Sequence, residues 1–447
     1  MNTPAVFELG NATCDAIMQQ PASDDLPDLD FAGHDTLYAT HGLHAYAAKC
    51  PPQLAKFAIL HYSQPGQLVL DPMAGSGTTL VEARLLGRSA IGFDLDPLAC
   101  LIARVKSSDL DAQDIDDHAQ AVITQVNCDL EELRSDRVSA AVRERSTPPD
   151  FPRRDYWFSP QVSKALALLS FHIGKSTMPE KVRDFLWVAF SSVILSKVSV
   201  ANARDIIHSR HHHFEHSVPP DVVSRFQTRV KIMRKQIANF QGLCSQVPAS
   251  TVEIHQGDAR QLTLPNDSID LVVTSPPYAT ALDYSRAHFL AIAWMQPVFN
   301  LSMEQYMALA PGYIGSERGH VDRIFKLDAQ LEPLPTAQSA LESLKDRDLR
   351  QAHLIQRYFK DMYAALGEMS RVLRPNGHVF IVVCPSHVRQ VQIPTHTVFT
   401  EMGQALGLRS VAEYQRTING NRRVLPYMRE AFGDRMSTEY VLVYQKG

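Results

Sequence analysis

The stretch Gln67-Leu68-Val69-Leu70-Asp71-Pro72-Met73-Ala74-Gly75-Ser76-Gly77 decides the fold class of this chain. Its apolar run ends in an acid and leads into a glycine-rich turn, and residues 78–86 then have the pattern of a helix that Gly87 closes. A second apolar run, residues 89–94, also ends in an acid. Strand, tight turn, helix and strand form a βαβ unit, so the sequence predicts an α/β fold with a parallel sheet.

The rest of the chain predicts two insertions in this α/β pattern. Its 447 residues can form one large catalytic core that carries its extra length as insertions. After residue 108, strand-like sequence does not return until residues 252–255 and 269–273, so the polar stretch between residues 109 and 250 is interpreted as a helical insertion. Further strands are predicted at residues 378–384 and 440–444. A second insertion, rich in turns and charge, spans about residues 296–350. The predicted parts are residues 1–108, 109–250 and 251–447.

Composition indicates a cytoplasmic protein. The apolar and charged fractions, 45% and 21%, are near those of soluble globular proteins, and no apolar run is long enough to span a bilayer. The first residues lack the basic and then apolar pattern of a secretory signal. The cysteines are scattered without a CxxC pair, which argues against a disulfide framework or a structural zinc module. We expect no membrane contact and no metal site.

The glycine-rich turn predicts a ligand that approaches the backbone closely. A nucleoside triphosphate would need a lysine after Gly77, and a nicotinamide dinucleotide would need a third glycine where Thr79 stands. Of the three ligand classes that use such a turn, S-adenosylmethionine remains. Asp71 and the turn would hold its methionine end. Asp94, roughly twenty residues beyond the first glycine, is placed to bond the ribose hydroxyls, and Asp258 could accept from the adenine amino group. The alternative is that these are ordinary turn and strand-end residues. The glycine-rich turn, Asp94 and Asp258 occur together, which makes that alternative less favoured. The predicted cofactor-binding residues are Asp71, Pro72, Ala74, Gly75, Ser76, Gly77, Thr78, Thr79, Asp94 and Asp258.

Ser275-Pro276-Pro277-Tyr278 directly follows a predicted buried strand. Proline cannot extend a strand ladder, so the pair forms a stiff rim at the carboxyl edge of the sheet, where open α/β folds bind ligands. The amino group of cytosine or adenine is a poor nucleophile because its lone pair is delocalised into the ring. Ser275 and the carbonyl of Pro276 can accept its two hydrogens, and Tyr278 offers a ring on which an extruded base can stack. The alternative, an ordinary proline turn, is disfavoured by the position downstream of a cofactor site.

Both motifs resemble those of the amino-methylating DNA methyltransferases, the family of N4-cytosine and N6-adenine enzymes. Residues 71–79 resemble the cofactor motif, with Met73 where phenylalanine is commoner, and residues 275–278 resemble the catalytic motif. The resemblance implies the class I S-adenosylmethionine-dependent methyltransferase fold, with a mostly parallel, Rossmann-like sheet and here a helical insertion. It also implies that a leading serine, Ser275, goes with methylation of cytosine N4. The cofactor motif precedes the catalytic motif, as in the unpermuted fold.

Residues 40–49 resemble the additional cofactor-pocket motif of this family, which packs just before the first strand. Ala45 and Cys50 depart from the proline and the aromatic residue that the family would have there. The resemblance therefore extends cofactor binding to two residues only, Tyr46 and Lys49.

Local positive charge predicts where double-stranded DNA binds, because the net charge of the chain is −4. Phosphate contacts by arginines would give affinity without sequence readout. Several of these arginines lie in the helical insertion, and a helix face exposed to solvent is an equally good interpretation of their positive charge. The histidines between His208 and His216 lack a partnering cysteine or aspartate at ligand spacing and are interpreted as part of a polar loop. The predicted DNA-binding residues are Arg204, Arg210, Arg225, Arg229, Arg422 and Arg423.

The expected function is site-specific transfer of a methyl group from S-adenosylmethionine to the N4 amino group of a flipped cytosine in duplex DNA. A cognate restriction endonuclease is the partner that this function would imply. The alternatives are N6-adenine methylation of DNA, base amino-methylation of RNA or tRNA by an enzyme of the same fold, and a catalytically silent module that binds the cofactor or DNA. Methyl-transfer assays distinguish these four functions.

Overall fold

A computed structural model describes residues 29–195, 199–202, 216–279, 284–318, 324–418 and 438–447. Four of the predicted DNA-binding residues lie outside the described residues, as do His208 to His213 of the histidine-rich segment. Those four are Arg204, Arg210, Arg422 and Arg423. No helix among the described residues is long and apolar enough to cross a membrane.

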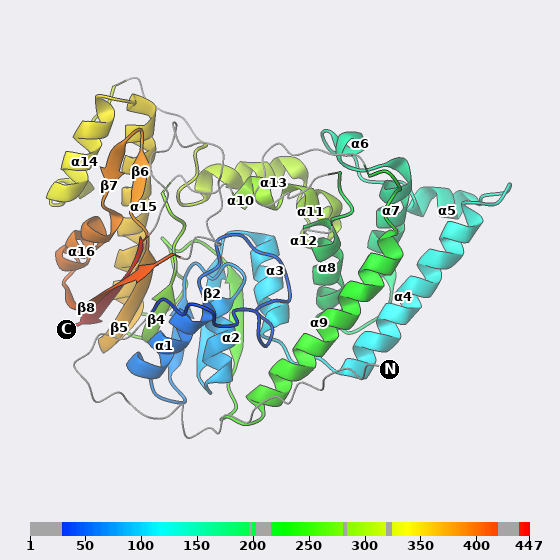
Figure 1. Ribbon diagram of the computed structural model, residues 1–447, viewed down its shortest axis with the longest axis horizontal. Helices are drawn as coiled ribbons and strands as arrows, with labels where there is room; N and C mark the ends of the chain where they lie inside the picture. The colour runs from blue at the N-terminus through cyan, green and yellow to red at the C-terminus, as the bar shows by residue number, and fades with distance from the viewer. Residues whose placement is uncertain (1–28, 196–198, 203–215, 280–283, 319–323, 419–437) are drawn as a thin grey trace, which may run out of the picture.

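A seven-stranded sheet forms the centre of the molecule, in the order β3-β2-β1-β4-β5-β9-β8 (Figure 1). Neighbouring strands are parallel from β3 to β5, whereas β9 runs antiparallel to both β5 and β8. This order and these directions are those of the class I methyltransferase fold, which confirms the predicted fold class. The strands are β1 (Leu68–Asp71), β2 (Ser89–Asp94), β3 (Val252–Gln256), β4 (Ile269–Thr274), β5 (Leu373–Val383), β8 (Leu408–Thr417) and β9 (Thr438–Lys446).

Helices cover both faces of the sheet because successive strand residues point to opposite faces. Val69 and Leu271 pack with α1 and α2 on one face, and Leu70 and Val272 pack with α14, α15 and α16 on the other. Both faces are therefore buried, which explains the continuous apolar runs of β1 and β4. These helices, with α3, are α1 (Pro52–Tyr62), α2 (Thr78–Leu85), α3 (Pro97–Lys106), α14 (Pro335–Lys345), α15 (Leu349–Val372) and α16 (Thr395–Ala405).

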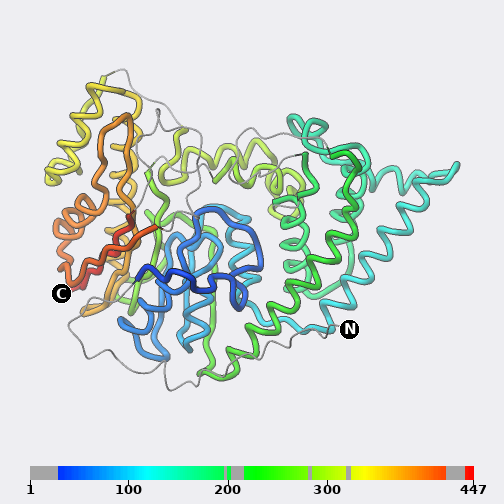
Figure 2. Tube along the Cα trace, viewed as in Figure 1, coloured from blue at the N-terminus to red at the C-terminus, as the bar shows by residue number. Residues whose placement is uncertain are grey.

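The described part of residues 109–250 consists of helices and their connections, with no strand. The helices pack on one another around a core of their own, which continues into α3 and α11. Figures 1 and 2 show them at one end of the molecule, opposite the end where α14 and α16 lie. The division of the chain at residues 108 and 250 stays a prediction. The helices are α4 (Ala112–Glu132), α5 (Ala140–Arg145), α6 (Arg154–Trp157), α7 (Pro160–Lys175), α8 (Glu180–Ile194) and α9 (Val222–Cys244).

The region that follows the catalytic motif contains more regular structure than the sequence indicated. Short helices occupy it up to α14, and a small hairpin of β6 and β7 follows β5. Strand β5 begins at Leu373, which pairs with Ile269, and the residues up to His378 form a bulge in which Asn376 has a φ of 65°. The elements are α10 (Tyr284–Ala287), α11 (Phe289–Trp294), α12 (Gln296–Phe299), α13 (Met303–Leu309), η2 (Ala310–Gly312), η3 (Ala329–Leu331), β6 (Ser386–Val388) and β7 (Val391–Ile393).

Candidate active site

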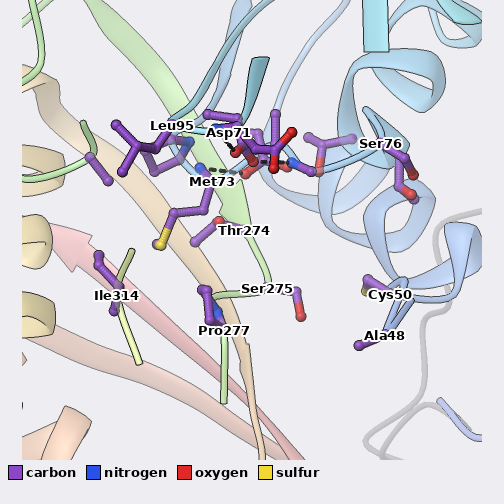
Figure 3. A pocket seen from close by; sticks show the side chains of 18 of the residues that line it. Ala48, Cys50, Asp71, Met73, Ser76, Leu95, Thr274, Ser275, Pro277 and Ile314 are labelled. Atoms are coloured by element: carbon purple, nitrogen blue, oxygen red, sulfur yellow. Dashed lines mark hydrogen bonds between the residues drawn. The ribbon is translucent and has the colours of Figure 1, made fainter. Parts of the chain in front are cut away.

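A pocket opens at the carboxyl ends of β1, β2 and β4, where the strand order reverses (Figure 3). Open α/β sheets bind their ligands at such a switch point. The pocket contains about 990 Å³ of space not filled by protein atoms, part of it open to solvent. Gly77, Pro276 and Tyr278 are predicted site residues that do not line it. The predicted residues that do are Tyr46, Lys49, Asp71, Pro72, Ala74, Gly75, Ser76, Thr78, Thr79, Asp94, Asp258, Ser275 and Pro277.

The glycine turn needs both of its glycines. Gly75 has a φ of 50° and Gly77 a φ of 80°, a region that side chains with a Cβ rarely adopt. A Cβ on Gly75 would lie 3.3 Å from the ring of Tyr46, and a Cβ on Gly77 would lie 2.9 Å from the Cβ of Ala103. Gly77 therefore allows α2 to start directly against α3, and Gly75 keeps the backbone open towards the pocket.

Two carboxylates in the pocket bind protons more tightly than usual. Burial raises the pKa of Asp71 to about 6, although the N–H of Met73 donates to it. Removal from water, together with the nearby charge of Asp96, raises the pKa of Asp94 to about 7. Asp94 accepts hydrogen bonds from the backbone N–H groups of Gly75 (2.8 Å) and Asp96 (2.9 Å). Asp94 is thus fixed at the end of β2 with lone pairs left for a ligand.

Asp96 is a pocket residue that the sequence analysis missed. One of its oxygens accepts the N–H of Leu98 at 2.9 Å and caps α3. The other lies 3.0 Å from Nδ1 of His288 and accepts the hydroxyl of Tyr313 at 3.1 Å and that of Tyr306 at 3.3 Å. Burial favours the neutral acid, but His288 and the hydrogen bonds outweigh it and hold the pKa of Asp96 below its usual range. Its place directly before a proline at a helix start was the available signal.

Arg260 was also missed, and it changes the interpretation of Asp258. The guanidinium of Arg260 donates to Asp258 at 2.6 Å, to Asp361 at 2.7 Å and to the carbonyl of Gly312 at 2.9 Å. Burial raises the pKa of Asp258, but these hydrogen bonds outweigh it and lower the pKa overall. Asp258 still lines the pocket, but its main partner in the structure is Arg260. The same arginine holds η2 against the pocket.

Aromatic side chains border the pocket beside the glycine turn. The ring of Tyr46 stacks on that of Tyr284, with centroids 5.7 Å apart, and lies 5.3 Å from that of His288. Lys49 donates to the carbonyl of His41 at 2.7 Å, and burial lowers its pKa to about 8. The two residues predicted from residues 40–49 therefore reach the same pocket as Gly75.

The catalytic motif forms the rim of this pocket. Figure 3 shows Ser275 and Pro277 on the side of the pocket away from Asp71, with Ile314 nearby. Tyr278 is half-buried, and its hydroxyl donates to Glu439 at 2.6 Å. The structure thus brings the cofactor residues together with Ser275, while Tyr278 lies just beyond the lining.

The two described arginines among the predicted DNA-binding residues contact their own chain. Arg229 donates to the carbonyls of Gly42 and Leu43, and Arg225 donates to that of Ser199 at 2.8 Å. These bonds tie α9 to neighbouring segments, so phosphate binding by either arginine stays a prediction that the observed contacts do not support. Within the described ranges, no group of three or more His, Cys, Asp or Glu residues could hold a metal ion.

Comparison with known proteins finds a DNA methylase domain and methyltransferase relatives. Residues 24–104 match the family model N6_N4_Mtase, described as DNA methylase, and this range includes Tyr46, the glycine turn and Asp94. Residues 24–104 therefore form part of a DNA methylase domain. Over 428 residues, the chain is 23% identical to the type II methyltransferase M.MvaI of Kocuria varians, and the match covers 91% of the chain and 90% of that protein.

Two further similarities are weaker. The type II methyltransferase M.BsoBI of Geobacillus stearothermophilus is 21% identical over 404 residues, 82% of this DNA methylase and 78% of that protein. The solved structure of a DNA modification methylase from Thermus thermophilus, TTHA0409, is 20% identical, with a TM-score of 0.22, and the match covers 42% of this chain and 52% of that one. The fold assignment therefore rests on the sheet order and not on that structure.

S-adenosylmethionine is the cofactor of this DNA methylase, and the pocket fits it. The close backbone approach at Gly75 suits the methionine end, whose charged groups need polar partners near the start of α2. Asp94 lines the pocket and could accept hydrogen bonds from ribose hydroxyls, and Leu95 and Ala259 would give apolar contacts for a purine ring. All of these residues belong to one continuous lining.

Proposed function

We propose that this DNA methylase methylates the N4 amino group of a cytosine that has been flipped out of duplex DNA. The observation that carries the proposal is that Ser275 and Pro277 line the same pocket as Asp71, Gly75 and Asp94. An amino group held at Ser275 would therefore lie beside the methyl donor. Such placement converts a reaction between two molecules into one between positioned groups, which is the main source of acceleration open to this site.

The residues of the catalytic motif would activate the amino group without a strong base. Ser275 Oγ and the carbonyl of Pro276 accept its two hydrogens, which draws the nitrogen towards tetrahedral geometry and frees its lone pair. S-adenosylmethionine supplies an electrophilic methyl group on a sulfonium. The new N–C bond forms as the C–S bond breaks, and the nitrogen then loses one proton to solvent. Tyr278 provides a stacking surface that keeps the base out of the duplex.

We infer that the enzyme acts at a specific DNA sequence in the cytoplasm, as part of a restriction-modification system with a cognate endonuclease. The similarity to M.MvaI along nine-tenths of the chain supports this inference, since that relative is named a type II methyltransferase. The family includes N6-adenine enzymes as well, so the choice of cytosine depends on the side chain of Ser275 alone.

Methyl transfer tests the proposal. Purified protein is incubated with labelled S-adenosylmethionine and unmethylated duplex DNA, and the nucleosides are analysed by mass spectrometry. N4-methylcytosine is expected. N6-methyladenine would overturn the base assignment, label in RNA alone would overturn the substrate class, and binding of the cofactor without transfer to either would favour a silent module.

The role of the catalytic motif needs a separate measurement. Tyr278→Ala should lower kcat for DNA by about tenfold or more, because a base stacked on an aromatic ring gains about 1–3 kcal/mol. Its affinity for S-adenosylmethionine should stay within about twofold of wild type, since Tyr278 does not line the cofactor pocket. Equal losses of turnover and cofactor affinity would show that the motif has a structural role only.

A further inference from the structure

We propose that Glu439, held in place by Arg416, is the positioning residue that orients Tyr278 for the target base. The inference rests on the proposed function of the catalytic motif. It adds two residues from the last two strands of the sheet, β8 and β9, to a site otherwise built from the first strands and the loops that follow them.

The topology explains why these distant residues meet. Strand β9 is antiparallel to β5, so its first residues lie at the edge of the sheet where the parallel strands end. Glu439 is the second residue of β9, and Arg416 is its direct partner on β8. Tyr278 leaves the end of β4 at this same edge and reaches across β5 to Glu439.

The three side chains form one chain of hydrogen bonds. The hydroxyl of Tyr278 donates to Oε1 of Glu439 at 2.6 Å, and Arg416 donates to Oε2 at 2.6 Å. The side chains of Arg416 and Glu439 are only 5% and 13% exposed. Arg416 is anchored in turn by the carbonyl of Asp30 at 3.4 Å. A buried carboxylate with two donors has a defined position, which makes it a precise anchor for the hydroxyl.

Tyr278 is thereby fixed at both ends. Gly315 packs against its backbone, since a Cβ there would lie 3.3 Å from the carbonyl oxygen of Tyr278. Burial and the charge of Glu439 hold the pKa of the phenol well above its ordinary value, so the hydroxyl remains a donor. The bond to Glu439 leaves the ring few orientations, and a stacking surface that is ordered before the base arrives loses less entropy on binding.

A double-mutant cycle tests the proposal. Tyr278→Phe removes the hydroxyl and keeps the ring, and Glu439→Gln removes the charge while keeping the shape of the side chain. Each single variant should lower kcat for methyl transfer to duplex DNA by about tenfold, because a ring that the hydroxyl no longer holds must be ordered when the base binds. In the Tyr278→Phe background, Glu439→Gln should add less than about twofold. Glu413→Gln, an exposed change on β8, is the matched control and should leave kcat unchanged.

A merely structural role of Glu439 predicts a different pattern. Glu439→Gln would then lower kcat by the same factor with and without the Tyr278 hydroxyl, and the affinity for the cofactor would fall together with kcat. Either result overturns the proposal. Titration with S-adenosylmethionine shows that each variant is folded.

Failure of the proposed function would be seen separately. If the wild-type protein transfers no methyl group to DNA, the same cycle is read in the unfolding midpoint of the cofactor-bound protein. Non-additive shifts would support the Tyr278–Glu439 coupling, and additive shifts would overturn it.

Discussion

Substitution of Gly77 by alanine should destabilise the protein through one identifiable contact. The new methyl group would lie 2.9 Å from the Cβ and 3.0 Å from the Cα of Ala103, so the start of α2 and helix α3 would have to separate. Overpacking of this kind costs about 1–3 kcal/mol. Alanine at a φ of 80° adds roughly 1–2 kcal/mol of backbone strain. We expect Gly77→Ala to lower the free energy of unfolding by about 2–5 kcal/mol.

Gly66 provides the control that separates the cost of overpacking from the cost of backbone strain. Its φ is 85°, close to that of Gly77, but a Cβ there would meet no atom within 4 Å. Gly66→Ala should therefore show the backbone strain alone, about 1–2 kcal/mol. Urea unfolding of the two variants and the wild type, followed by circular dichroism, gives the difference. That difference should be about 1–3 kcal/mol, the overpacking at Ala103.

Cofactor binding gives a second readout of the same change. Gly77 ends the glycine turn, so moving it shifts Gly75 and Ser76 in the pocket, and the Kd for S-adenosylmethionine should rise more than tenfold; Gly66→Ala should leave the Kd unchanged. The reasoning is refuted if the two variants are equally destabilised, because the contact with Ala103 would then have no energetic effect.

Three further outcomes follow from the site. Arg260→Ala should lower the free energy of unfolding by about 2–3 kcal/mol and weaken cofactor binding. Arg374→Ala, which breaks a half-exposed ion pair, is the control and should cost less than about 1 kcal/mol. Similar losses for the two variants in thermal unfolding would contradict a special role of Arg260. His288→Ala should lower the free energy of unfolding by about 2 kcal/mol because the buried Asp96 loses its contact with Nδ1 of His288, and a loss below about 1 kcal/mol would argue against that pairing. The raised pKa of Asp94, about 7, means that the folded apoprotein binds this proton more tightly than the unfolded chain, so this carboxyl makes stability fall as pH rises from about 4 to 7. If the ionised form binds the ribose, cofactor affinity should fall about tenfold per pH unit below 7 in calorimetric titrations, and a flat profile would exclude that role.

The part of the site that the sequence predicted lies within short stretches of the chain. Asp71, the glycine turn and Asp94 belong to one βαβ unit, in which each residue's place depends on strand ends and a turn close by. A local pattern is sufficient there, because parallel neighbours bring their carboxyl ends to one edge. Ser275 and Pro277 were predicted for the same reason, from the strand that precedes them.

The residues that the sequence did not predict depend on contacts between distant segments. Arg260 beside Gly312, and Glu439 beside Tyr278, are separated along the chain by 52 and 161 residues. Asp258 was predicted to bind the adenine amino group, but in the structure its main partner is Arg260. The spacing of residues in the sequence does not predict this contact. Strand β8 was overlooked because its residues alternate weakly between exposed and buried positions at the edge of the sheet.

The sequence by itself determined the fold class, the order of cofactor and catalytic motifs and the chemical types in the pocket, because these follow from local hydrophobic patterns and backbone constraints. Only the tertiary structure decided which charges are satisfied within the chain. Arg225 and Arg229 look like phosphate ligands in the sequence but bond backbone carbonyls in the fold. The physical reason is that a side chain's partner depends on what the packed core brings within about 3 Å of it, and that distance is set by the whole fold.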